Sequence, residues 1–291
     1  MADAGGPNAP FERIGIIGTG LIGGSIAIAA RRQWPTIRVI GTPSRHCELP
    51  AGMLDRTVSD IVDLAADVDL VILGVPVTVM PDMMQTLARA GTTAVVTDVG
   101  STKRGVMAAA DAAGLRRFIG GHPMAGGERP GAGEARADLF VGKPWLLVEG
   151  PAPPEDATRL EGFVRALGAV PRWMSADLHD RTVAYVSHLP QVVAAALMNA
   201  AEQAVGATGP HVAGNAFAEM TRLASSPAEM WQGICAENAD FVAEALRAFL
   251  EQLPDGRGLA DGTWTHEALS RSGIARDRWR GIRKAEPGGA R

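Results

Sequence analysis

Two polar side chains follow predicted strands closely enough to act on a bound ligand. Ser101 comes shortly after an apolar strand predicted over 93–98, and His122 lies just beyond a second apolar segment at 118–120. Ligands of open α/β sheets bind at the carboxyl ends of the strands. A neutral imidazole accepts a proton near physiological pH, so His122 is a candidate general base, with a structural histidine as the alternative. For Ser101 the alternative is a helix N-cap.

A second group of polar side chains recurs at helical spacing in the segment SHLPQ. It contains Ser187, His188 and Gln191. Residues three and four apart are neighbours on a helix, so one face of a long helix predicted over 176–207 carries all three side chains. We expect this face to line the ligand site.

The stretch IGIIGTGLIGGSIAIAA at 14–30 is uncharged and rich in glycine. A membrane helix is one interpretation, but a span needs about 20 apolar residues, and five glycines would weaken a single helix. Divided at the glycines, the stretch predicts a strand at 14–17, a tight turn and a helix over 21–32. This arrangement with G-x-G-x-x-G is typical of dinucleotide-binding sites.

Each glycine of this motif has a physical task. Gly18 permits the tight turn, Gly20 lets the backbone approach a pyrophosphate, and Gly23 lets helix and strand pack closely. The helix N-terminus then binds the anion. The predicted cofactor site also includes residues at the start of this helix and at the end of the strand predicted over 69–75, namely Leu21, Ile22, Val75 and Pro76.

The end of the second predicted strand, at 37–41, bears on the choice of cofactor. In an NAD site an acidic residue there binds the ribose 2′-hydroxyl, but here Thr42, Pro43, Ser44 and Arg45 follow. Ser44 and Arg45 can receive a 2′-phosphate through charge-assisted hydrogen bonds, and a solvated loop arginine is the alternative. The sequence therefore favours NADP, with NAD still open.

The order of the predicted elements indicates an α/β fold. Short apolar strands alternate with helical segments at 78–90 and 102–113, which predicts a parallel sheet covered on both faces and a Rossmann-type dinucleotide-binding domain over 11–174. Further edge strands are expected at 118–120, 145–148 and 171–174. Beyond 174 only helical periodicity remains, which predicts an all-helical domain for substrate binding and dimerisation over 175–284.

Composition excludes several classes of protein. The 291 residues carry a formal net charge of −4 with scattered basic residues, so the electrostatic footprint of a nucleic-acid binder is lacking. Cys47 and Cys235 lie far apart without neighbouring ligands, so neither a metal site nor a disulfide framework is expected. The first residues lack the features of a signal peptide. We expect a cytoplasmic protein that contacts no membrane.

Four further stretches are more specific than the glycine motif. They are DVGSTK (98–103), GGHPMAGGERPGAGEARADLF (120–140), DRTVAYVSHLPQ (180–191) and MTRLASSPAEMW (220–231). Together they make the chain resemble the prephenate and arogenate dehydrogenase family of tyrosine biosynthesis over about 14–238. The segments HPMAG and SHLPQ carry most of this resemblance.

The resemblance implies an oxidoreductase acting on a small cyclohexadiene. Its substrate carries a hydroxyl at C4, a carboxylate at C1 and a pyruvyl (prephenate) or alanyl (arogenate) side chain. Hydride leaves C4 for the nicotinamide, the hydroxyl loses its proton, and carbon dioxide departs as the ring becomes aromatic. By the same resemblance His122 is the catalytic base, and Ser101 orients that histidine and the substrate.

The resemblance also implies substrate contacts and a partner. His188 matches a histidine that lies against the substrate, and Arg222 matches an arginine that holds a carboxylate, with a surface salt bridge as the alternative. Arg129 is a further candidate anion contact, and Ser187 and Gln191 accompany His188. Helical domains of such dehydrogenases often form homodimers, and an ordinary core is the alternative for the apolar residues here.

Several other expectations concern residues near these motifs. We expect Lys103 to be a solvated helix residue, Asp180 to support helix geometry or a domain contact, and Trp231 to pack beneath the site. Pro130, Ala218 and Pro227 stand where the family usually has polar residues, so the choice between prephenate and arogenate does not follow.

Two other functions stay open. One is a different two-domain dehydrogenase, such as one for β-hydroxyacids. Those enzymes commonly use a lysine in the helical domain, whereas here no lysine occurs between Lys143 and Lys284. The other is a protein that senses NADP without turnover, which would lack a base opposite the nicotinamide.

Overall fold

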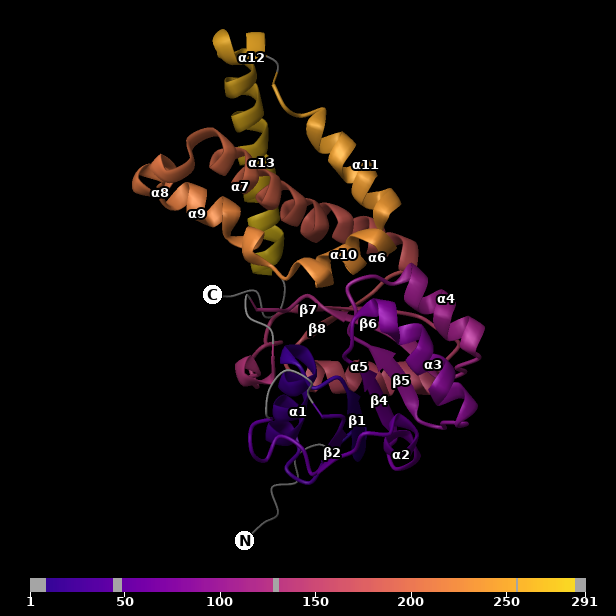
Figure 1. Ribbon diagram of the computed structural model, residues 1–291. Helices are drawn as coiled ribbons and strands as arrows, with labels where there is room; N and C mark the ends of the chain where they lie inside the picture. Colours follow the sequence, from indigo (N-terminus) through magenta and orange to yellow (C-terminus); the bar gives the residue numbers. More distant parts are fainter. Residues whose placement is uncertain (1–8, 44–48, 128–130, 255, 286–291) are drawn as a thin grey trace. The chain divides into compact units, whose positions relative to one another are not determined.

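The centre of the fold is one mostly parallel sheet. A computed structural model describes residues 9–43, 49–127, 131–254 and 256–285. Within these residues eight strands pair in the order β3-β2-β1-β4-β5-β6-β7-β8 (Figure 1). The strands are β1 (Arg13–Ile17), β2 (Arg38–Gly41), β3 (Arg56–Thr57), β4 (Leu70–Leu73), β5 (Val95–Asp98), β6 (Phe118–Pro123), β7 (Pro144–Val148) and β8 (Val170–Trp173).

Helices cover both faces of the sheet because its central strands are apolar on both sides. Successive residues of a strand point to opposite faces, and the buried side chains accordingly divide into two clusters. Ile14 and Ile16 of β1 belong to one cluster, with α1 (Leu21–Gln33) and α5 (Pro154–Ala166). Ile17 belongs to the other, with α2 (Ile61–Ala66), α3 (Met80–Arg89) and α4 (Arg104–Ala113). The predicted α/β class is confirmed.

One strand runs against the others. The edge strand expected at 145–148 is β7, which pairs antiparallel with β6, so that His122 lies opposite Leu146. Parallel strands need a crossover, usually a helix. The described residues between β6 and β7 contain only a 3₁₀ turn at Ala132–Glu134, so the chain returns beside β6 in the opposite direction. The helix α5 then brings β8 parallel to β7.

The residues after β8 are helical, as predicted, with an interruption that the periodicity did not reveal. The helix expected over 176–207 consists of α6 (Ala176–Val183), a π-helical segment (Ala184–His188) and α7 (Leu189–Val205). The segments that follow are α8 (Gly209–Val212), α9 (Asn215–Thr221), a 3₁₀ turn (Arg222–Ser225), α10 (Ala228–Glu237) and α11 (Ala239–Leu250). A π segment inside an α-helix often marks a functional site.

The chain divides into two compact units, Met1–Val242 and Ala243–Arg291. The first contains the sheet and the helices through α10. The second contains α12 (Gly256–Ala260) and α13 (Thr263–Ala285). Among the described residues, every helix is too short or too polar to cross a membrane.

The glycine motif forms the turn between β1 and α1. Gly18 has a φ of +97°, a conformation that a side chain would strain. A Cβ on Gly23 would lie 2.2 Å from the Gly18 carbonyl oxygen, whereas a Cβ on Gly20 would meet no atom within 4 Å. Helix and strand therefore pack closely at Gly23, and the backbone at Gly20 faces open space.

These two glycines give a matched pair of substitutions. We expect Gly23→Ala to lower the free energy of unfolding by about 1–3 kcal/mol, since the added methyl group overpacks the turn. Gly20→Ala should change it by less than about 0.5 kcal/mol. Urea unfolding followed by circular dichroism measures both. Equal destabilisation by the two variants would contradict the close approach at Gly23.

Candidate active site

A buried ion pair holds the loop that follows β5. Lys103 Nζ lies 2.6 Å from Asp98 Oδ2 and donates to the carbonyls of Gly100 and Thr102, and both charged side chains are fully buried. The carboxylate also accepts the N–H groups of Gly100 and Gly121. The expectation that Lys103 is solvated is therefore wrong. Its side chain turns inward because Asp98, at the end of β5, offers a buried partner.

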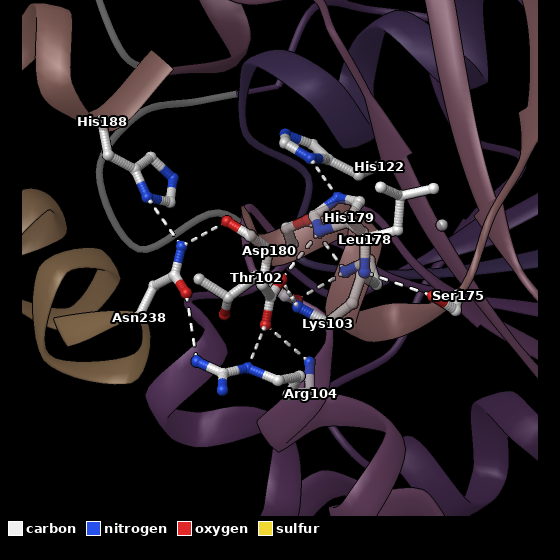
Figure 2. A network of polar contacts seen from close by, with 12 residues as sticks. Thr102, Lys103, Arg104, His122, Ser175, Leu178, His179, Asp180, His188 and Asn238 are labelled. Atoms are coloured by element: carbon white, nitrogen blue, oxygen red, sulfur yellow. Dashed lines mark hydrogen bonds and ion pairs between the residues drawn. The ribbon is translucent and has the colours of Figure 1, made fainter. Parts of the chain in front are cut away.

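His122 lies at the carboxyl end of β6 and begins a line of three side chains. Its Nδ1 is 2.9 Å from Nε2 of His179, and Nδ1 of His179 is 2.7 Å from Oδ1 of Asp180 (Figure 2). His179 and Asp180 are fully buried, and His122 is 9% exposed. The strand β6 and the helix α6 thus supply one continuous polar chain, and His179, its central member, lies outside the motifs of the sequence.

Asp180 also fastens α6 to the start of α4. Its carboxylate accepts the main-chain N–H groups of Lys103 and Arg104 at 2.7 and 2.8 Å. Helix α4 begins at Arg104, with Lys103 as its N-cap, and N–H groups at the start of a helix have no partner within the helix itself. Asp180 therefore caps a helix from a distant part of the chain, which fits its expected supporting role. Ser101 is not the N-cap of α4, because Lys103 occupies that position.

The surroundings keep this line in one protonation state. Burial alone would raise the pKa of Asp180, but hydrogen bonds from His179, Arg104 and Lys103 outweigh it and lower the pKa. Burial also lowers the pKa of His179, although Asp180 opposes this. The pKa of His122 lies well below its ordinary value because of burial, with smaller effects of His179, Lys103 and His188. Both imidazoles are thus neutral at pH 7, beside an ionised carboxylate.

His188 ends the π segment, and one of its ring nitrogens has no partner among the described residues. Asn238 donates its amide N–H to Nδ1 of His188 at 3.2 Å and to the carbonyl of Asp180 at 2.8 Å. Arg104 can only donate, so its contact with Asn238 Oδ1 fixes the orientation of that amide. Burial lowers the pKa of His188 to about 4, so the neutral ring carries its proton on Nε2. That buried nitrogen has no partner in the described structure.

The other predicted substrate contacts lie around α7. Gln191 donates to the carbonyl of Leu223 at 2.7 Å and accepts from Ser226 at 3.2 Å, so both ends of its amide bind the chain itself. This places the 3₁₀ turn that contains Arg222 against α7, and Arg222 is exposed there. Ser187 is half-buried within the π segment. Trp231 packs edge-on against His188, with ring centroids 5.8 Å apart.

The turn after β1 fits a dinucleotide. Gly20 is the N-cap of α1 and offers no side-chain hydrogen bond, and the space beside its backbone is open. N–H groups at a helix N-terminus bind phosphate, and Leu21 and Ile22 are the first two residues of α1. Val75 and Pro76 follow β4 at the same edge of the sheet, half-buried and exposed respectively. The turn is tied to the end of β2, because Thr42 Oγ1 accepts the N–H of Gly18.

Three of the predicted site residues cannot be placed. The expectation of NADP rests on Ser44 and Arg45, which lie outside the described residues, as does Arg129. Ser101 is described and half-buried, but no hydrogen bond joins it to His122 among the contacts of the described residues. Clusters of three or more potential metal ligands are likewise absent from the part of the chain that the structure describes.

Three features together define the class of protein. A doubly wound sheet presents a glycine turn suited to a dinucleotide, and a neutral buried histidine lies at the same edge of the sheet. The helical segments after β8 add His179 and His188 beside it. These are the features of a two-domain nicotinamide-dependent dehydrogenase.

Comparison with known proteins identifies the family. The family model "prephenate dehydrogenase, nucleotide-binding domain" matches residues 26–170, and "prephenate dehydrogenase, dimerization domain" matches residues 175–259. The chain belongs to the prephenate and arogenate dehydrogenase family, which confirms the resemblance found in its motifs. It is 30% identical to a prephenate dehydrogenase of Bacillus subtilis over 84% of this chain and 69% of the relative.

Two solved structures share the fold over nearly their whole length. Prephenate dehydrogenase from A. aeolicus, in complex with hydroxyphenyl propionate and NAD+, has a TM-score of 0.81 and 26% identity, over 93% of this chain and 98% of that one. Arogenate dehydrogenase from Synechocystis has a TM-score of 0.74 and 27% identity, over 92% and 99%. The chain thus resembles proteins named for either substrate.

The buried ion pair gives a stability prediction. We expect Lys103→Met to lower the free energy of unfolding by about 3–5 kcal/mol, because it leaves the Asp98 carboxylate buried without its cation. The double variant Asp98→Asn/Lys103→Met should recover much of this loss, since it removes both charges. Urea unfolding measures the free energy of unfolding of the single and the double variant. A single variant within 1 kcal/mol of the unmodified protein would contradict the burial of the pair.

Proposed function

We propose that this chain catalyses the NAD(P)-dependent oxidative decarboxylation of prephenate to 4-hydroxyphenylpyruvate, or of arogenate to tyrosine. The observation that carries the proposal is His122, a neutral buried imidazole at the sheet edge where the dinucleotide turn also lies. Membership of the family and the similarity to proteins acting on either substrate support it.

His122 is the proposed base. Its Nε2 accepts the proton of the C4 hydroxyl as the C4–H bond breaks, and a bound nicotinamide supplies the acceptor for that hydride. The bond between C1 and its carboxylate then breaks, and its electron pair enters the ring as carbon dioxide leaves. The ring oxygen becomes a phenol by taking a proton back, so His122 serves first as base and then as acid.

Other side chains are proposed to bind the substrate. Nε2–H of His188 is a buried donor with no hydrogen-bond partner among the described residues, which suits a substrate oxygen. Arg222, Arg129 and Ser187 are proposed as further contacts, with Arg222 holding a carboxylate. Ser101 is proposed to orient the substrate beside His122. The two hydrogen bonds of Gln191 support a role in holding the turn that contains Arg222.

We extend the proposal to cofactor and assembly. Gly18, Gly20 and Gly23, with Leu21, Ile22, Val75 and Pro76, would hold the cofactor, and Ser44 and Arg45 would favour NADP by binding its 2′-phosphate. The proposed active form is a cytoplasmic homodimer joined through the helical domain, with domains at 11–174 and 175–284. The match to a dimerization domain supports this assembly.

The direct test is formation of reduced nicotinamide by the purified protein. Prephenate and arogenate are each assayed with NAD and with NADP at saturating concentrations. Turnover with at least one pair supports the proposal and determines both specificities. Folded protein that binds cofactor but turns over none of the four pairs would overturn it.

The role of His122 can be tested by substitution. We expect His122→Asn to lower kcat by roughly 10²–10⁴-fold, the usual contribution of a positioned base. The dissociation constant of the cofactor should change little, because the glycine turn is intact. His266→Asn, which alters an exposed histidine, is the control and should keep full activity. Steady-state kinetics and a binding titration measure both effects, and an unchanged kcat would remove His122 from the mechanism.

The lowered pKa of His122 predicts the pH dependence of the reaction. A base must be unprotonated to accept a proton. Because the pKa of His122 lies well below 6.5, this imidazole is unprotonated at pH 6.5 and above. We therefore expect kcat/KM to be level between about pH 6.5 and 8 and to fall only in more acidic solution. A decline of kcat/KM centred at pH 6.5 or above would contradict a dry, buried base.

A further inference from the structure

We propose that His179, held by Asp180, is a positioning residue that sets the tautomer of His122 and leaves Nε2 as its proton-accepting atom. The inference deepens the proposed function and rests on it for the role of His122. It concerns a side chain outside the motifs that carried the family resemblance, which resume at Asp180.

The ionised carboxylate of Asp180 can only accept hydrogen bonds. Asp180 Oδ1 accepts the N–H of Lys103 and faces Nδ1 of His179, each at 2.7 Å. An ionised carboxylate carries no proton to donate. Nδ1 of His179 must therefore carry the hydrogen of this contact.

The next contact follows from the neutrality of His179. A neutral imidazole has one N–H, so with Nδ1 protonated its Nε2 is an acceptor. This atom lies 2.9 Å from Nδ1 of His122. His122 must then donate from Nδ1, and its Nε2 keeps the lone pair that a base requires. In the opposite tautomer of His122, two lone pairs would face each other at this distance.

The surroundings exclude the remaining arrangement, in which His179 is protonated on both nitrogens. The charged groups that act on it are the carboxylates of Asp180 and Asp98, which favour protonation, and the ammonium of Lys103, which opposes it. Asp98 and Lys103 form their own ion pair, and His179 is fully buried. Burial disfavours the charged form of His179 and outweighs the two carboxylates, so the ring does not take a second proton.

The anchor of the line is rigid. Asp180 is held at its carboxylate by the first turn of α4 and at its carbonyl by Asn238. Because both ends of Asp180 are fixed, the donor direction of His179 cannot reverse without breaking a helix cap. In hydrolases a carboxylate orients the catalytic imidazole directly. Here Asp180 orients His122 in a similar way, but through the second imidazole of His179.

The tautomer can be observed directly. The chain has six histidines, so nitrogen-15 NMR of protein with labelled histidine is tractable, with His122→Asn for assignment. In the unmodified protein we expect the shift of His122 Nδ1 to be that of a protonated nitrogen and that of Nε2 to be that of an unprotonated one. The reverse pattern would overturn the inference whether or not the protein turns over prephenate or arogenate.

Two variants of His179 separate its two contacts. The amide of His179→Asn reaches only the position of Nδ1 and keeps the contact with Asp180, whereas His179→Gln can present an acceptor near the position of Nε2. We expect His179→Asn to lower kcat on the order of 10²-fold and to mix the tautomers of His122. His179→Gln should retain most of the activity and a single tautomer.

The comparison of kinetic constants excludes a merely structural role. Both variants should keep the cofactor KM close to that of the unmodified protein, so that the loss falls on kcat. His179→Gln gives up the contact with buried Asp180 and should have the lower melting temperature of the two, whereas His179→Asn should have the lower kcat. If both variants keep full kcat and the tautomer of His122 is unchanged, the inference is overturned. Equal loss of kcat in the two variants with an unchanged tautomer would also overturn it.

Discussion

The carboxylate of Asp180 is the interaction on which the site depends. It accepts three hydrogen bonds from main-chain and imidazole donors and sits fully buried where α6 meets the start of α4. A buried charge is tolerated only when it is this well satisfied. The side chain of Asp180 thereby joins α6 to the loop after β5. It also determines which nitrogen of His179 donates, and hence which nitrogen of His122 donates.

A second buried carboxylate performs a separate task nearby. Asp98 pairs with Lys103, and its other oxygen binds the N–H of Gly121 next to His122. The ion pair adds no net charge to the site, so the neighbouring imidazoles respond mainly to their burial. The ion pair of Asp98 and Lys103 thus holds both β6, which carries His122, and the loop after β5. It fixes the position of His122 without favouring protonation of the ring.

The sequence predicted local features well and long-range pairings poorly. Glycine spacing and apolar runs revealed the turn after β1 and the strands, because these depend on neighbouring residues. The reversal of β7, the burial of Lys103 and the partnership of His122 with His179 depend on contacts between distant residues. A lone histidine before an aspartate carries no signal of its own. The family motifs pointed to His122 and His188 but not to what orients them.

The π segment at Ala184–His188 has a geometric consequence for the two histidines beside it. In an uninterrupted α-helix, residues 179 and 188 would be nine positions apart at about 100° each, and so on opposite sides. The wider π turn changes the angle between residues 179 and 188 around the helix axis. Asn238 can therefore reach both the carbonyl of Asp180 and the ring of His188. An insertion or deletion in this segment would change the angle between the two histidines around the helix axis by about 100° for each residue, and so would separate His188 from the contacts of Asn238.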